Sequence, residues 1–174
     1  MNQMSNHFQD LNNLNIEVMR AEEEWQRAGA YSVRIEGMNR QHHISLREEF
    51  DEHDGPGTRY IVLLDDGYPV ATCRFFEAAG TEYAEASSRY AGLDKLVMIG
   101  RMVVLPEYRG LGLGAKTIRE AERWIRDLGY EHIGVDSRIG AVGFYEPLGF
   151  EVIDPEVYIS GPFECKAMVK RLTK

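Results

Sequence analysis

A glycine-rich loop that joins a long apolar segment to an amphipathic one constrains the fold of this chain most strongly. The segment KLVMIGRMVVL, residues 95–105, is almost continuously apolar, which is typical of a strand buried on both faces. The segment AKTIREAERWIRDLG, residues 115–129, has its apolar residues at helical spacing and ends in a glycine, as helices often do. The stretch YRGLGLGAKT, residues 108–117, therefore leads into a helix N-terminus, whose free N–H groups and dipole attract an anion.

Two nucleotide-binding patterns nearly fit this loop. Residues 110–117 read G-x-x-x-x-A-K-T, which is one residue away from the phosphate loop of ATPases, but Ala115 replaces the glycine before the lysine. The same glycines fit the dinucleotide pattern G-x-G-x-x-A, and Asp136 ends the next predicted strand, about where a ribose-binding acid would lie. Both patterns place the loop directly after its strand, whereas PEYR (106–109) intervenes here, and too few residues follow Asp136 for further βαβ units. Both are kept as weaker alternatives.

A third pattern accounts for the intervening residues. Arg109, Gly112 and Gly114 fit R-x-x-G-x-G, and GFYEPLGF (143–150) follows after a predicted helix and strand. In this order and spacing the two motifs resemble the GNAT superfamily of acyl-CoA N-acyltransferases, and the resemblance extends over about residues 15–172. More narrowly, the stretches REEFDEHD and IGRMVV are similar to a bacterial branch of small, uncharacterised acetyltransferases.

The resemblance implies an α/β fold in which a mixed central sheet splays around acetyl-CoA and is flanked by helices. It also implies direct transfer of an acetyl group from acetyl-CoA, as co-substrate, to a primary amine, with no metal. By the same resemblance Tyr145 is the acid that protonates the departing thiolate; taken alone, it would be a core aromatic with a solvated hydroxyl. The backbone groups implied to hold the pantetheine arm and the acetyl carbonyl belong to Met102, Val103 and Val104. The N–H groups implied to hold the pyrophosphate belong to Arg109, Gly110, Leu111, Gly112, Leu113, Gly114 and Ala115.

The chain departs from the family pattern around its second motif. Ser137 and Arg138 stand where Asn or Gln is common, and Pro147 stands where Lys is common, so the CoA contacts of the short helix stay open. The alternative function is a non-catalytic acyl-CoA sensor or regulatory module of the same fold, because the glycine loop would bind CoA in either case. Retention of Tyr145 favours the enzyme.

An acidic segment is the candidate for binding the amine. REEFDEHD, residues 47–54, holds five carboxylates and one histidine. Glu49 and Asp51 alternate about a phenylalanine, so an extended segment would turn both to the same side, where they could attract an ammonium group and accept its proton. The competing interpretation is a solvated acidic loop. Arg101, which interrupts the apolar strand, is expected either to pair in the core or to point into the active cleft.

The remaining pattern and composition favour one cytoplasmic domain over residues 15–174, preceded by a loose lead-in over residues 1–14. A strand is predicted at 15–20, a helix at 21–38, a hairpin at 58–76 with Asp66-Gly67 as its turn, and strands and a short helix after residue 130. The net charge of −8 opposes nucleic-acid binding, and no segment reads as a signal peptide or a membrane span. The expected partner is a small-molecule or peptide amine, and a homodimer is left open.

Overall fold

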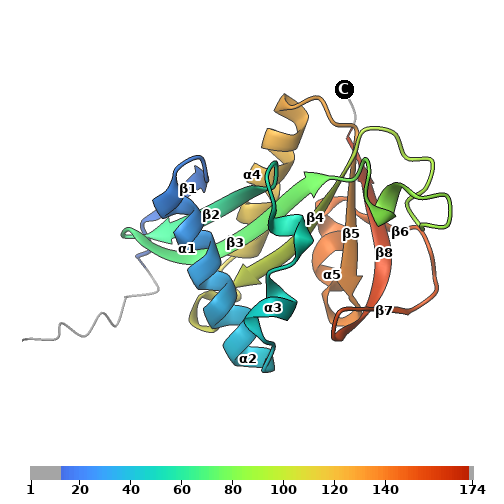
Figure 1. Ribbon diagram of the computed structural model, residues 1–174. Coiled ribbons are helices and arrows are strands. Elements are labelled where there is room, and N and C mark those ends of the chain that lie inside the picture. The colour runs from blue at the N-terminus through green and yellow to red at the C-terminus, as the bar shows by residue number, and fades with distance from the viewer. Residues whose placement is uncertain (1–12, 173–174) are drawn as a thin grey trace, which may run out of the picture.

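A mixed eight-stranded sheet organises residues 13–172, the part of the chain that this computed structural model describes (Figure 1). Its strands follow the order β1-β2-β3-β4-β5-β8-β6, with β7 paired to β8, and only β4 and β5 run parallel to each other. The strands are β1 (Ile16–Arg20), β2 (Arg59–Asp65), β3 (Tyr68–Glu77), β4 (Leu96–Val104), β5 (His132–Arg138), β6 (Glu151–Val152), β7 (Tyr158–Ser160) and β8 (Phe163–Arg171).

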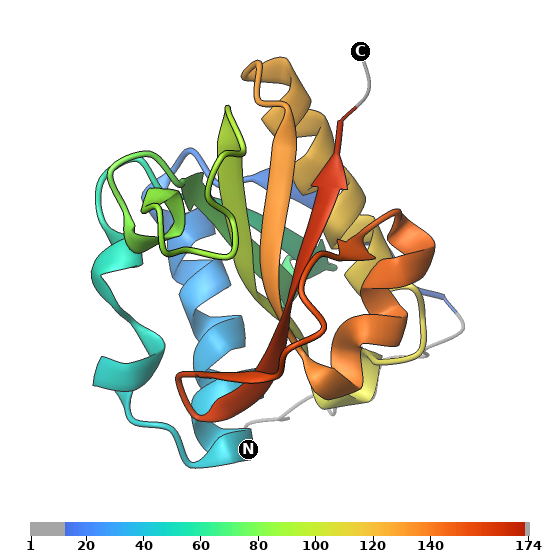
Figure 2. The same ribbon diagram turned by 90° about the vertical axis from the view of Figure 1, so that its right-hand side faces the viewer.

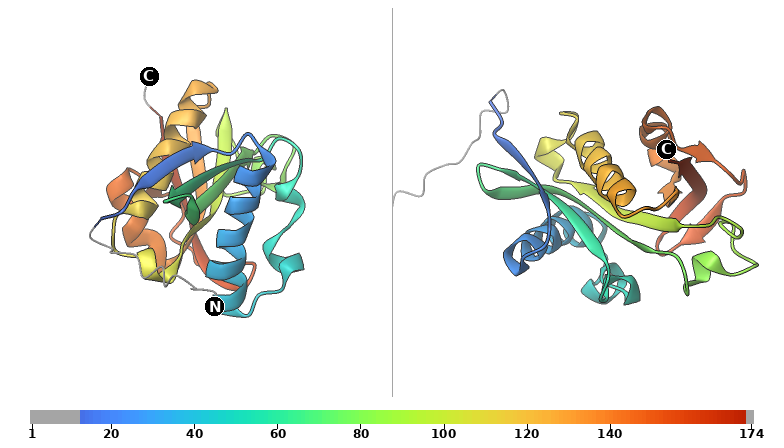
Figure 3. Two further views of the ribbon diagram at one scale, coloured as in Figure 1. Left: turned by 90° about the vertical axis from the view of Figure 1, so that its left-hand side faces the viewer. Right: turned by 90° about the horizontal axis from the view of Figure 1, so that it is seen from above.

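Helices cover both faces of this sheet, because its central strands are apolar on both sides. The helix α1 lies on one face and α4 and α5 lie on the other (Figures 2 and 3). Ile61 and Leu63 of β2 share a core cluster with α4, whereas Tyr60 and Val62 share one with α1, as the two-residue period of a strand requires. The α-helices are α1 (Glu24–Arg34), α2 (Arg40–His42), α3 (Leu46–Glu49), α4 (Leu113–Asp127) and α5 (Val142–Tyr145). A π-helical turn occupies Ile35–Asn39, and 3-10 turns occupy Glu52–Asp54, Glu82–Ala84, Pro106–Tyr108, Ile139–Ala141 and Glu146–Leu148.

The sheet widens at its centre, between β4 and β5. These strands pair only where Leu96–Met98 face His132–Gly134, and the rest of each strand leaves the other. Gly134 permits the close approach at the last pair, because a Cβ there would lie 2.6 Å from the Met98 sulfur. The predicted splay of the central sheet is therefore confirmed, and the two strands meet only at one end.

A bulge in β4 lies in the widened half. Thr72 of β3 pairs with Val103 and Arg74 pairs with Gly100, so two residues of β4 oppose one of β3. Arg101 is one of the two, and its φ of 48° is left-handed, a conformation that few residues other than glycine adopt. The bulge changes the direction in which the following backbone faces the opening.

The predicted elements agree with the structure wherever their signal is local. The first strand, the hairpin with its Asp66-Gly67 turn, the long apolar strand and the helix after the glycine loop are all present. The predicted lead-in lies almost wholly outside the described residues, and β7 was not predicted. Within residues 13–172 no helix combines the length and apolar character needed to cross a bilayer.

Candidate functional site

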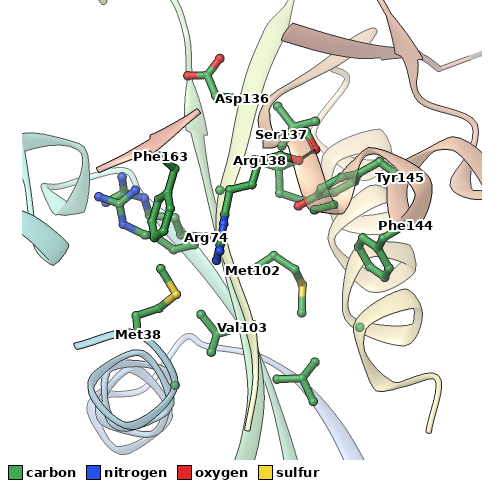
Figure 4. Close-up of a pocket in the computed structure, with 18 of the residues that line it drawn as sticks. Met38, Arg74, Met102, Val103, Asp136, Ser137, Arg138, Phe144, Tyr145 and Phe163 are labelled. Atoms are coloured by element: carbon green, nitrogen blue, oxygen red, sulfur yellow. Dashed lines mark hydrogen bonds between the residues drawn. The ribbon is translucent and has the colours of Figure 1, made fainter. Parts of the chain in front are cut away.

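A cavity of about 850 Å³ occupies the widened half of the sheet (Figure 4). On one side it is bounded by the glycine loop, the start of α4 and the aromatic residues Phe144 and Tyr145 of α5. On the other side of β4 it is bounded by Arg74, Phe163 and Met38. The cavity therefore passes between β4 and β5 and has a wall on each face of the sheet.

The glycine loop places an open helix N-terminus at this cavity. Gly112 is the N-cap of α4 with φ 78°, and no side chain caps the helix. The first N–H groups of α4, from Leu113 to Ala115, have no carbonyl one turn earlier in the helix to bind. Gly114 lies against α5, since a Cβ there would come within 3.1 Å of the Phe144 ring. This geometry suits an anionic group of a ligand.

Most residues of the predicted CoA site lie at the cavity, and one does not. Leu111 is exposed and does not line it, whereas the other nine do: Met102, Val103, Val104, Arg109, Gly110, Gly112, Leu113, Gly114 and Ala115. Arg109 also donates from Nε to the Val104 carbonyl at 2.9 Å, which ties the loop to the end of β4. Their contact with CoA stays a prediction.

Tyr145 is both a core aromatic residue and a residue of the cavity wall, the two positions that the sequence left open. Its side chain is 5 % exposed and its ring packs edge-on against Phe144 and Phe150. Its hydroxyl nevertheless points into the cavity (Figure 4). Burial raises the pKa of Tyr145 well above its usual range, so the hydroxyl carries its proton at neutral pH. Its catalytic role stays a prediction.

Three arginines and three carboxylates form a buried group next to the cavity. This arginine–carboxylate network consists of Arg34, Arg74, Arg101, Glu49, Asp51 and Asp54. Arg34 is fully buried and donates to Glu49 at 2.8 Å and to Asp54 at 2.6 Å. Arg101 contacts Glu49 at 3.2 Å and Asp51 at 3.1 Å, and it also lines the cavity. It therefore both pairs with buried carboxylates and faces the cleft, which the sequence had left as alternatives.

The network corrects the prediction made for the acidic segment. Glu49 ends the helix α3, so the segment is not extended as that prediction assumed. Glu49 is 2 % exposed, neither Glu49 nor Asp51 lines the cavity, and both are paired with arginines. Although burial alone would raise it, the pKa of Asp51 is lowered by Arg74 and Arg101, which makes a proton harder to accept. The structure gives no support to a cationic acceptor held by these two carboxylates.

Four charged residues of the cavity wall, Arg74, Arg101, Asp136 and Arg138, were not among the predicted catalytic or CoA-binding residues. Arg74 stands in the apolar strand segment VATCRFF, where its charge is the only signal. Asp136 of β5 was considered only as a ribose-binding acid, yet it is the sole carboxylate among the described residues that line the cavity. Tyr90 donates to it at 2.7 Å, and Tyr158 donates to the same oxygen, Oδ1. The part of the chain that is described holds no group of three metal-ligand side chains.

Comparisons with known proteins agree on one family. The pattern of the Acetyltransferase (GNAT) family matches residues 14–150. An uncharacterised acetyltransferase of Streptococcus pyogenes serotype M3 is 28 % identical over 129 residues, covering 74 % of this chain and 80 % of the relative. A Lactobacillus plantarum structure, described as a candidate N-acetyltransferase, has 26 % identity and a TM-score of 0.76, covering 91 % of this chain and 99 % of that one. An acyl-CoA N-acyltransferase from Pseudomonas aeruginosa has the same fold, with a TM-score of 0.70, 21 % identity and coverage of 91 % and 99 %.

Proposed function

Because the chain belongs to the acetyltransferase (GNAT) family, we propose that it transfers an acetyl group from acetyl-CoA directly to a primary amine. One observation carries this proposal: a single cavity joins an uncapped helix N-terminus to a second wall across the sheet. An acyl donor held at the glycine loop could therefore place its acyl group between β4 and β5, while an amine approaches from the opposite face of the sheet.

The residues of the cavity suit the steps of such a transfer. The N–H groups at the start of α4 would hold the pyrophosphate, and the backbone of Met102 to Val104 would hold the pantetheine amides and the acyl carbonyl. Attack by a neutral amine forms the C–N bond and breaks the C–S bond. Tyr145 would give its proton to the departing thiolate, and the amine proton must leave to a base or to water.

Tyr145→Phe tests the proposal, because it keeps the ring packing and removes only the hydroxyl. We expect kcat to fall about 100-fold with the best amine, the lower range for a lost general acid, while acetyl-CoA affinity stays nearly unchanged. Steady-state release of free CoA and calorimetry with acetyl-CoA measure the two quantities. Tyr130→Phe is the matched control, because this half-buried tyrosine does not line the cavity.

The outcomes separate the enzyme from its alternative. Unchanged turnover in Tyr145→Phe would make this tyrosine a packing residue only. If the parent protein binds acetyl-CoA but releases no CoA with any amine of a broad library, the sensor is the better description.

A further inference from the structure

We propose that the acceptor is an amine that also carries a carboxylate, such as an α-amino acid, and that Arg74 and Asp136 bind its two charged groups. This inference rests on the proposed function and assigns the acceptor class. The acceptor chamber is defined here as the part of the cavity bounded by Arg74, Phe76, Tyr83, Met98 and Asp136.

The alternation of side chains in the strands places this chamber opposite the glycine loop. Cys73 and Phe75 of β3 belong to the core cluster that includes α4, so Arg74 and Phe76 project from the other face. By the same alternation Val135 of β5 packs on the α4 side and Asp136 does not. An acceptor in the chamber would thus approach the acyl group from the side away from the CoA loop.

Arg74 offers a buried donor that the protein itself does not use. Its side chain is 3 % exposed, and its terminal nitrogens bind Asp51 at 2.7 and 3.0 Å and Asp54 at 2.6 Å. Its Nε, in contrast, is buried and has no hydrogen-bond partner within residues 13–172. A buried donor without a partner costs about 1–3 kcal/mol. Arg74 lines the chamber, and a ligand oxygen that reached this nitrogen would recover this cost.

The charges around Arg74 favour a carboxylate as the source of that oxygen. Four arginines line the cavity as a whole, Arg74, Arg101, Arg109 and Arg138, against the single carboxylate of Asp136 among the described residues. Carboxylates that do not line the cavity pair with two of them, Arg74 and Arg101. Burial first, and then the neighbouring Arg74, lowers the pKa of Arg101, while Glu49 and Asp51 act to raise it. A carboxylate can accept hydrogen bonds from the guanidinium groups of the wall, whereas a protonated polyamine has only donors to offer them.

Asp136 provides the counterpart for the ammonium group. Tyr90 and Tyr158 both donate to Oδ1, which fixes the carboxylate, and neither bond uses Oδ2. The Tyr83 hydroxyl lies within the influence of both charged groups, because Asp136 adds to the effect of burial in raising the pKa of Tyr83 while Arg74 opposes it. Arg74 and Asp136 line the same chamber, so a ligand bound there can contact both.

The same carboxylate can take the proton that the reaction must remove. The ammonium of the acceptor would give one proton to Asp136, and the neutral amine would then form the C–N bond as the C–S bond breaks. The nitrogen loses its second proton as the amide forms, and this proton replaces the one that Tyr145 gives to the thiolate. Asp136 also lines a second cavity of about 240 Å³, together with Glu82, Glu85 and Ser88. The proton can leave to water through this smaller cavity, without crossing the face of the sheet where the acyl donor binds.

Matched acceptors test this inference on the unmodified protein. With acetyl-CoA as donor, CoA release is measured for L-phenylalanine, L-phenylalaninamide and 2-phenylethylamine, and for L-leucine, L-leucinamide and 3-methylbutylamine. These side chains suit the apolar wall of Phe76 and Met98. We expect kcat/KM to be at least about tenfold higher for each amino acid, because the simple amines leave the Arg74 donor unpaired and the amides offer it only a neutral acceptor. Equal or faster reaction of the analogues would overturn the inference while leaving the proposed function intact.

Two variants test the roles proposed for Arg74 and Asp136. Arg74→Lys keeps the charge beside Asp51 and Asp54 but removes the Nε–H group, so KM should rise about tenfold for L-phenylalanine and stay unchanged for 2-phenylethylamine. Asp136→Asn should lower kcat for all amines and leave acetyl-CoA affinity unchanged in calorimetry. The controls are Arg123→Lys and Asp127→Asn, which alter exposed residues of α4 that line neither cavity.

The outcomes distinguish this inference from the function on which it rests. An equal rise of KM for both amines in Arg74→Lys, or unchanged kcat in Asp136→Asn, contradicts the assigned roles. If Arg74→Lys does not fold, the comparison of acceptors on the parent protein still decides. If no amine at all is acetylated, the proposed function fails and the acceptor class fails with it.

Discussion

Gly112→Val is expected to weaken acetyl-CoA binding by at least about 100-fold. Gly112 has a left-handed φ of 78° and no atom within 4 Å of the position that a Cβ would take. That empty space faces the cavity, so a valine side chain would occupy the place of the ligand's phosphates. Losing two hydrogen bonds to a charged group, at about 1.5–3 kcal/mol each, corresponds to a loss of this size. Calorimetry with acetyl-CoA measures it.

The control for this variant is Gly92→Val. Gly92 has φ 80°, equally open surroundings and no place in the cavity, so it bears the same backbone strain of about 1–2 kcal/mol without touching the site. We expect both variants to lose similar stability and only Gly112→Val to lose affinity. Undiminished binding of acetyl-CoA by Gly112→Val would contradict the assignment of the loop. Tight binding of NADH or ATP by the parent would instead favour the dinucleotide or P-loop pattern.

Arg34→Met is expected to lower the free energy of unfolding by about 3–5 kcal/mol, the cost of removing one partner from a buried ion pair. Arg34 is fully buried, and its loss would leave Glu49 and Asp54 without their shared partner. Urea unfolding measures the change. Arg123→Met is the control, because its pair with Glu120 is exposed and should contribute less than about 1 kcal/mol.

A double variant and a pH series make this prediction specific. Arg34→Met combined with Glu49→Gln should cost less than the sum of the single changes, since each single change removes the same Arg34–Glu49 ion pair. Burial acts to raise the pKa of Asp54, but Arg34 and Arg74 lower it overall. A carboxyl with a lowered pKa in the folded state stabilises the fold above its unfolded pKa, about 3.9 for aspartate, and this stability is lost as the pH falls below that value. Asp54→Asn should therefore reduce the loss of stability between pH 5 and pH 2, and an unchanged pH dependence would contradict the role of the network.

The sequence predicted the parts of the site whose residues lie next to one another along the chain. The glycine loop, its helix and the hairpin turn depend on neighbouring residues, and they were placed correctly. The ion pairs of the acidic segment could not be predicted, because its arginine partners come from α1, β3 and β4, far away along the chain. Asp136 could not be assigned for a similar reason, since its tyrosine partners lie before β4 and in β7. Charged residues inside apolar strands, such as Arg74 and Arg101, were the available signal for a buried polar site.

Because β4 and β5 pair at one end only, the contact at Gly134 affects the angle between the two halves of the sheet. One wall of the cavity, with Arg74 and Met102, belongs to the first half of the sheet, and the other, with Asp136, belongs to the second. A side chain at Gly134 would clash with Met98 and push β4 and β5 apart at their paired end. This would change the angle between the two cavity walls. Substitutions at this position can thus alter how well donor and acceptor are aligned without touching either of them.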